Sequence, residues 1–102
     1  MPRFFPDHHL RQLRNQISFP RLFALLHWPH KRRGDQWAFL CPHCSETNSA
    51  VNPRTNLARC FHCETNFNPI DFTMAVQHCS FVDAVHYLEP QLPHHRDQTV
   101  DR

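Results

Sequence analysis

Long apolar stretches are missing from this sequence. The best apolar cluster, Leu22 to Trp28, contains His27 and is followed by Pro29, so no run approaches the roughly 18 apolar residues that a membrane-spanning helix needs. No apolar segment of the signal-peptide type follows the N-terminal Met1-Pro2-Arg3. We therefore expect a soluble cytoplasmic protein with no membrane partner, in a compartment where thiols stay reduced.

Glycine and internal repeats are equally scarce. The only glycine, Gly34, lies in a polar and basic segment from His30 to Asp35, where we predict a loop containing a turn. No repeat or low-complexity block appears, and 102 residues are enough for one domain with a modest buried core. A chain of this size is expected to need a stabilising element besides its core.

The apolar periodicity predicts two helices in the first part of the chain and two in the last part. Asn68 and Ser80 are expected to cap the third and fourth helices, and Pro29 and Pro90 to end the second and fourth. The predicted helices cover residues 6–17, about 18–27, about 68–78 and 80–89. Because the end of the chain is polar, we predict a domain of residues 1–90 and a flexible tail of residues 91–102.

Between the helices, the sequence alternates in the manner of short strands. Gln36 to Leu40 is predicted to be a strand that carries Trp37 and Phe39 on one side and runs into Cys41. Two further strands are predicted at residues 49–51 and 57–59, with a turn at residues 52–56 between them. This order is typical of a short antiparallel ribbon.

Four of the five cysteines form two matched pairs. Cys41 and Cys44 are separated by two residues, as are Cys60 and Cys63, and fifteen residues lie between the pairs. This is the spacing of a tetrahedral zinc site. Two residues between paired cysteines let the backbone form a knuckle that points both sulfurs at one ion, and four thiolates leave no position for a catalytic water. We predict one structural zinc ion.

Other interpretations of the cysteines stay open at this point. A redox-active C-x-x-C motif would explain one pair only, and an iron–sulfur cluster can use the same four thiolates. His43 and His62 lie inside the knuckles and could each replace a neighbouring cysteine as a ligand. Cys79 has no partner at knuckle spacing and lies between two apolar helical stretches, so we expect a buried, inert thiol.

Positive charge is concentrated in the N-terminal part of the chain. Residues 1–40 contain seven lysines and arginines against two aspartates, whereas the remainder contains four arginines against seven acidic residues. The formal net charge of +2 counts cysteine as a neutral thiol, and four thiolates on a divalent ion bring the chain near zero. The basic part nevertheless permits a local site for a polyanion.

Three segments in a fixed order carry a family resemblance. Cys60-Phe61-His62-Cys63 is followed by Asn68-Pro69-Ile70-Asp71-Phe72-Thr73-Met74 and then by Ser80-Phe81-Val82-Asp83-Ala84-Val85-His86-Tyr87-Leu88. They resemble the second knuckle, the N-x-I-D-F-x-M segment and the following helix of the CHC2 zinc fingers, the zinc-binding domains of DnaG-type DNA primases from bacteria and phages. Upstream, Lys31-Arg32-Arg33-Gly34 is similar to the family's basic approach to the first cysteine, so the likeness covers about residues 1–90.

The resemblance implies a small α+β domain, a zinc ribbon with a short antiparallel sheet flanked by N-terminal and C-terminal helices. It also implies a module whose sheet face recognises single-stranded template DNA while a separate catalytic domain makes the primer. The chain ends where a primase would continue into that domain. We therefore expect neither enzymatic activity nor a small-molecule substrate.

The chain departs from the family pattern around the cysteines. Cys44 stands where the family usually has a histidine ligand, which makes the ligand set all-cysteine. The loop from Cys44 to Cys60 is short and lacks the family's Lys-Thr-Pro-Ser-Phe run. Glu64 and Phe67 replace glycines that are typical after the second knuckle.

Basic and aromatic residues of the ribbon are the candidates for DNA contacts, because cations pair with phosphates and aromatic rings stack on bases. The candidates are Lys31, Arg32, Arg33, Trp37, Arg54, Arg59 and Phe61. Other roles remain open for several of them. Trp37 and Phe39 could instead pack in the core against the sheet, and the charges of residues 31–33 could simply be solvated. Arg59 could instead form hydrogen bonds that support the metal ligands.

The sequence favours a zinc-binding DNA-recognition module in the replication or priming of a phage or mobile element. Its expected partners are single-stranded DNA and a primase-polymerase or helicase supplied in trans, in a bacterial or phage-infected cell. The alternative is a protein-docking ribbon whose helices bind a replication, transposition or regulatory partner. Near-neutral charge and the shortened loop would favour that alternative.

Overall fold

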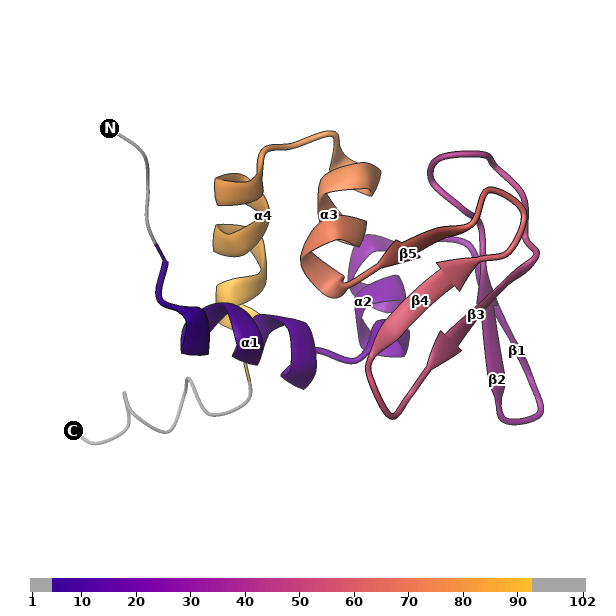
Figure 1. Cartoon of the computed structure of the whole chain (residues 1–102), viewed down its shortest axis with the longest axis horizontal. Helices are drawn as coiled ribbons and strands as arrows, with labels where there is room; N and C mark the ends of the chain where they lie inside the picture. The colour runs from indigo at the N-terminus through magenta and orange to yellow at the C-terminus, as the bar shows by residue number, and fades with distance from the viewer. Residues whose placement is uncertain (1–4, 93–102) are drawn as a thin grey trace.

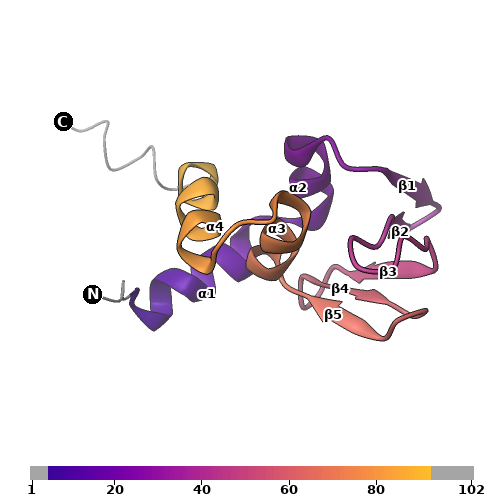
Figure 2. The ribbon, with the colours of Figure 1, turned by 90° about the horizontal axis from the view of Figure 1, so that it is seen from above.

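Four helices and two small antiparallel sheets make up the part of the chain that the computed structural model describes, residues 5–92 (Figure 1). The elements in chain order are α1 (Asp7–Gln16), α2 (Phe19–Leu26), β1 (His30–Arg33), β2 (Gln36–Phe39), β3 (Ser49–Asn52), β4 (Leu57–Cys60), β5 (Thr65–Phe67), α3 (Pro69–Gln77), α4 (Phe81–Leu88) and the 3-10 turn η1 (Glu89–Gln91). Figure 2 shows α1 and α4 at one end, the strands at the other, and α2 and α3 between them. The predicted α+β ribbon with flanking helices is confirmed. None of the described helices has the length and apolar character needed to cross a membrane.

The helices lie where the periodicity predicts them, and the predicted caps are formed. The side chain of Asn68 accepts a hydrogen bond from the backbone N–H of Asp71 at 2.7 Å, and that of Ser80 accepts one from Asp83 at 3.1 Å. Ser18 caps α2 in the same way. Asp71 and Asp83 therefore occupy first helical turns, where a negative charge favours the helix dipole.

Hydrogen bonds to Glu89, just after α4, connect α1 to the end of that helix. Glu89 accepts hydrogen bonds from His9 at 2.7 Å and from His86 at 3.2 Å. Burial alone would raise the pKa of Glu89, but the bonds from the two histidines outweigh it and lower that pKa. Leu92, beyond η1, is buried, so packed residues adjoin the predicted boundary of domain and tail. Residues 93–102 of the predicted tail lie outside the described residues.

The segment from His30 to Asp35 is only partly a loop. Residues 30–33 form strand β1, which pairs with β2 so that Lys31 lies opposite Ala38 and Arg33 opposite Gln36. The loop prediction was wrong here because all four side chains of β1 are exposed, and an exposed edge strand has no apolar alternation. The predicted turn is confirmed at Gly34, whose φ of 59° favours glycine.

Strands β3, β4 and β5 form the second sheet. The predicted hairpin of residues 49–59 is confirmed, with each strand one residue longer than predicted, whereas β5, only three residues long, was not predicted. Asn56 in the hairpin turn has a left-handed φ of 55°. Its side-chain amide donates to the backbone carbonyls of Arg14 and Ile17, both at 2.7 Å, and so ties the turn to the end of α1.

A serine joins the two sheets. The hydroxyl of Ser49, at the start of β3, accepts a hydrogen bond from the backbone N–H of Phe39 at 2.8 Å and donates one to the carbonyl of the same residue at 2.7 Å. Because Phe39 is buried, its backbone groups need protein partners. The Ser49 hydroxyl thus satisfies both backbone hydrogen-bonding groups of Phe39, which in a continuous sheet would pair with a neighbouring strand.

Phe72 of α3 is the centre of the core. Its ring meets five others with centroids 5.5–6.2 Å apart, mostly edge to face, the geometry that aromatic pairs prefer. These rings belong to Phe19, Phe23, Trp28, Phe39 and Phe67. The cluster draws residues from α2, β2 and the end of β5 onto α3, so helices and ribbon share one core.

We expect Ser49→Ala to lower the free energy of unfolding of the zinc-loaded protein by about 2 kcal/mol, because it leaves two backbone groups of a buried residue unpaired. Chemical denaturation followed by far-UV circular dichroism measures this. Ser49→Thr keeps the hydroxyl and is expected to retain most of the stability. Equal stability of Ser49→Ala and the wild type would show that the bridge does not join the sheets.

Candidate metal centre

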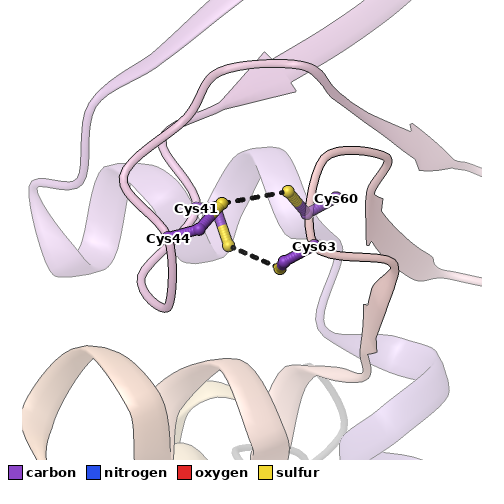
Figure 3. A group of neighbouring side chains, drawn as sticks. All are labelled: Cys41, Cys44, Cys60 and Cys63. Atoms are coloured by element: carbon purple, nitrogen blue, oxygen red, sulfur yellow. Dashed lines mark hydrogen bonds between the residues drawn. The ribbon is translucent and has the colours of Figure 1, made fainter.

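Four cysteine side chains converge between the two sheets (Figure 3). Cys41 and Cys44 lie in the segment after β2, Cys60 is the last residue of β4, and Cys63 lies on the turn between β4 and β5. All four sulfurs lie within 4.8 Å of one another. Within residues 5–92, this is the only group of three or more histidine, cysteine or acidic side chains close enough to hold one metal ion.

The sulfur separations match zinc and do not match disulfides. Cys44 Sγ lies 3.5 Å from Cys60 Sγ, and Cys41 Sγ lies 3.7 Å from Cys63 Sγ. Zinc–sulfur bonds of about 2.3 Å in a tetrahedron place the sulfurs about 3.8 Å apart. A disulfide needs about 2.05 Å. A closed set of four soft sulfur donors at these separations is suited to zinc.

The first knuckle is built by the backbone around Cys41. Its N–H donates to the carbonyl of Glu46 at 2.8 Å, and its carbonyl accepts from the N–H of Ser45 at 2.9 Å. The N–H of His43 points at Cys41 Sγ at 3.4 Å, a contact that favours the thiolate. Ser45 then adopts a left-handed φ of 65°, which turns the chain away from the site.

The second knuckle ends with the same backbone device. Glu64, directly after Cys63, has a φ of 60°, so a residue with a side chain occupies the left-handed region at a cost of about 1–2 kcal/mol. This is one of the two positions at which the sequence replaces a family glycine. Phe67, at the other, is buried in the core against Phe72. The free energy gained by burying the Phe67 side chain offsets the backbone strain at Glu64.

The thiols differ in their acidity. Loss of hydration is the main cause that raises the pKa of Cys44 to about 12, and burial also raises the pKa of Cys41. The pKa of Cys63 is lowered to about 7, mainly by the hydrogen bond with the Thr65 hydroxyl 3.2 Å away. The Cys63 thiol thus ionises more readily than the Cys41 and Cys44 thiols, whose burial disfavours a negative charge, and a divalent ion among the sulfurs would favour the thiolate form of all of them.

The other candidate ligands lie outside the cluster of sulfurs. The ring of His43 packs against Phe67 with centroids 5.1 Å apart, and His62 is exposed. Cys79 is half-buried rather than buried as predicted, because it lies at the turn between α3 and α4. Burial is the main cause that raises its pKa, and the negative charge of Asp83 adds to it. Its thiol is therefore held protonated, away from the other four.

The pleat of the β1–β2 hairpin divides the candidate DNA-binding residues between two faces. Paired residues of a ladder share a face, and successive residues alternate. Lys31 and Arg33 therefore lie on one face, which we call the outer face, and Arg32 and Trp37 on the other. On that other face, the Arg32 guanidinium lies 5.6 Å from the Trp37 ring, and Phe39 is buried.

The second sheet continues the outer face. Val51, Ala58 and Phe67 are buried and mutually paired on the inner side, so Arg59, one residue on from Ala58, is on the outer side. The Arg59 guanidinium lies 5.9 Å from the ring of Phe61. Arg59 donates to the side chain of Asn66 rather than to the cysteines. Arg54 is exposed in the turn between β3 and β4.

Sequence periodicity alone does not reveal this division, because Lys31, Arg32 and Arg33 are consecutive and look equivalent. It also gives no sign that Gln36 and Asn66 share the outer face with them. Only the ladder register separates the residues.

Comparison with family models matches the chain to the CHC2 zinc finger of the DnaG type over residues 6–101. Comparison with curated proteins gives no match. The matched range contains all four clustered cysteines, and the cluster is typical of the single structural zinc site of such a finger. The resemblance noted in the sequence is therefore confirmed, and the cofactor is one zinc ion.

We expect zinc removal to unfold the ribbon, because the ion supplies folding free energy that a core of this size lacks. The purified protein should contain one zinc per chain by elemental analysis, and a strong chelator should abolish its cooperative thermal unfolding transition. Added zinc should restore that transition. Unchanged melting after complete removal of the metal would contradict a structural role.

Cys79→Ala is expected to retain one zinc per chain, whereas Cys44→Ala is expected to lose most of its zinc, because it opens the four-sulfur set. Elemental analysis after dialysis against a weak chelator separates the two variants. Loss of zinc from Cys79→Ala would show that the ligands are assigned wrongly.

Proposed function

The chain belongs to the CHC2 zinc finger family, and on that premise we propose that it is a non-catalytic module that binds single-stranded template DNA on the outer face of its ribbon. In primases, the CHC2 zinc finger is a non-catalytic module. A closed four-thiolate site offers no position for a reactive water. Asp71 and Asp83, the acidic residues nearest to the helix caps, serve the helices instead of forming an acid–base pair.

The observation that carries the proposal is the charge of the ribbon. None of the five described strands contains an aspartate or a glutamate, whereas β1 and β4 contain lysine and arginine. The acidic residues of the described chain lie in loops, turns and helices. Glu46, in the loop before β3, is an acidic residue beside Arg33 and Ala50. Strands that carry cations and no anions are suited to a phosphate backbone even in a protein of near-zero net charge.

Phe61 supplies a surface for stacking. Phe61 is 49% exposed, and the Arg59 guanidinium lies beside its ring. The bond from Arg59 to Asn66 at 3.1 Å holds the guanidinium in place. An exposed ring flanked by a fixed cation is the combination with which proteins bind successive bases of a single strand.

An open groove of about 590 Å³ runs over this part of the outer face. It begins at Gln36 of β2, crosses β3 at Ala50, and reaches Arg59, Phe61 and Asn66. Small and amide side chains keep its floor low and offer hydrogen-bond donors and acceptors to bases. The groove gives an extended strand a course across both sheets.

Three of the candidate DNA-binding residues lie outside the groove, namely Arg54, Arg32 and Trp37. Arg54 lies at the hairpin turn, which Asn56 anchors to α1, so it can reach a phosphate at the edge of the groove. Arg32 and Trp37 pack against each other on the opposite face of β1 and β2. We assign these two to the stability of the hairpin and not to DNA.

We place this activity in the replication or priming of a phage or mobile element, in the cytoplasm of a bacterial or infected cell. The module would present template to a primase-polymerase or helicase supplied in trans. The family supports a primase-related role in general.

A second candidate, docking to a replication, transposition or regulatory protein, is supported by Phe81. This residue of α4 is 40% exposed and lies far along the chain from the ribbon strands. Binding through an apolar helix face would depend little on salt, whereas binding of DNA weakens steeply as salt rises.

The zinc-loaded protein is expected to bind fluorescent single-stranded oligonucleotides more tightly than duplexes, with a salt-dependent affinity. Each phosphate contact adds about 0.7 to the slope of log K against log salt for a single strand, so Lys31→Ala/Arg33→Ala should reduce that slope by about 1.4. Fluorescence anisotropy across a salt series measures both quantities.

Arg32→Ala is the matched control, because it removes one cation of the same segment from the opposite face. It is expected to leave the salt slope unchanged. A loss of slope of about 0.7 in Arg32→Ala, the value for one phosphate contact, would contradict the assignment of the outer face. Absence of binding to either form of DNA at low salt would overturn the proposal and favour docking.

A further inference from the structure

Beside the groove, the β1–β2 hairpin carries a second and smaller hollow of about 220 Å³. Pro29, Lys31 and Arg33 line it from the β1 side, Ala38 and Leu40 from the β2 side, and Thr47 from the loop that precedes β3. Lys31 and Arg33 belong to the outer face, and so does Ala38, which lies opposite Lys31. The hollow therefore opens on the face proposed to bind DNA.

The hollow exists because a small residue lies between larger ones. Ala38 contributes only a methyl group to the floor of the hollow, whereas the longer side chains of Lys31 and Arg33 lie on one side of it and Thr47 on the other. The backbone N–H of Leu40 donates to the carbonyl of Pro29 at 3.1 Å, and the indole of Trp28 donates to the carbonyl of Leu40 at 2.7 Å. These bonds fix the open end of the hairpin, where Pro29 and Leu40 line the hollow.

The metal knuckle positions the opposite wall. The carbonyl of Glu46, next to Thr47, accepts the hydrogen bond from the N–H of Cys41 at 2.8 Å. On the other side of the loop, Ser49 is bound to Phe39 through its hydroxyl. Thr47 is thus held at both ends of a short loop, and the hollow is preformed.

The lining fits one kind of ligand. Proline, alanine and leucine supply apolar contact, Thr47 brings a hydroxyl, and Lys31 and Arg33 provide two cations. The residues lining the hollow include no aspartate or glutamate. A flat, largely apolar ring attached to an anionic backbone satisfies both halves of this chemistry, and a nucleotide is such a ligand.

Size restricts the occupant further. Pockets for drug-sized ligands measure roughly 300–1,000 Å³. The hollow is smaller than that range, so it suits one base and not a run of stacked bases. The larger open groove around Phe61, by contrast, lies along the path of an extended strand.

We infer that the hollow over Ala38 is a subsite for a single nucleobase, which leaves the stack of the bound strand and enters between Lys31 and Arg33 on one side and Thr47 on the other. The inference rests on the proposed function and deepens it, because one position of the template is then recognised by insertion of its base. The two cations bind the phosphates on either side of that base.

The test replaces one base at a time by an abasic site in a single-stranded oligonucleotide and measures affinity by fluorescence anisotropy. For the wild-type protein, an abasic site at one position is expected to weaken binding about tenfold. In Ala38→Leu, which fills the hollow and removes no charge, that difference between intact and abasic strands is expected to disappear. Zinc content and thermal melting verify that the variant is folded.

Ala24→Leu is the matched control, since Ala24 is exposed on α2 and lines neither the hollow nor the groove. It should keep the abasic effect at that position. Thr47→Leu narrows the hollow from the loop and should behave like Ala38→Leu, so a folding defect in one variant leaves the other to decide.

The outcomes separate the two proposals. Binding by the wild type with the same abasic effect in Ala38→Leu and Thr47→Leu would overturn the subsite and leave the DNA-binding function standing. Binding with no abasic effect at any position would do the same. No binding of single strands by the wild type would overturn both.

Discussion

The ion held by four thiolates is the constraint on which the ribbon depends. Cys41 follows the last strand of the first sheet, and Cys60 ends the middle strand of the second, so one ion ties together two sheets that share no backbone ladder. Besides the ion, the Ser49 hydroxyl links them directly. The outer face spans both sheets, and its shape therefore follows from the metal. In this sense the zinc is structural and also sets the shape of the face proposed to bind DNA.

The shortage of glycine shows how much local strain this arrangement accepts. Five residues with side chains have left-handed backbones in the described chain, among them Ser45 and Glu64 directly after the knuckles. Such conformations persist only where surrounding contacts hold them. Here the sulfurs and the aromatic cluster around Phe72 provide those contacts, because Phe67 lies within the cluster three residues after Glu64.

The sequence alone predicted the helices, their caps and the convergence of the cysteines, because these depend on short-range spacing. It did not predict β1, whose exposed Lys31 and Arg33 give no apolar alternation, or the bridge made by Ser49, which is a long-range pairing. The separation of Arg32 from its neighbours depends on register, which a run of like charges does not encode. The metal site could therefore be predicted from cysteine spacing, whereas the face proposed to bind DNA could be identified only from the fold.

The most direct test of the account is X-ray absorption spectroscopy at the zinc edge of the purified protein. The account predicts one zinc per chain with four sulfur ligands at about 2.3 Å and no nitrogen ligand. A shell containing nitrogen would bring in His43 or His62, whose side chains lie outside the sulfur cluster, and would contradict the all-cysteine site. Fewer than four sulfurs would likewise break the link between the two sheets.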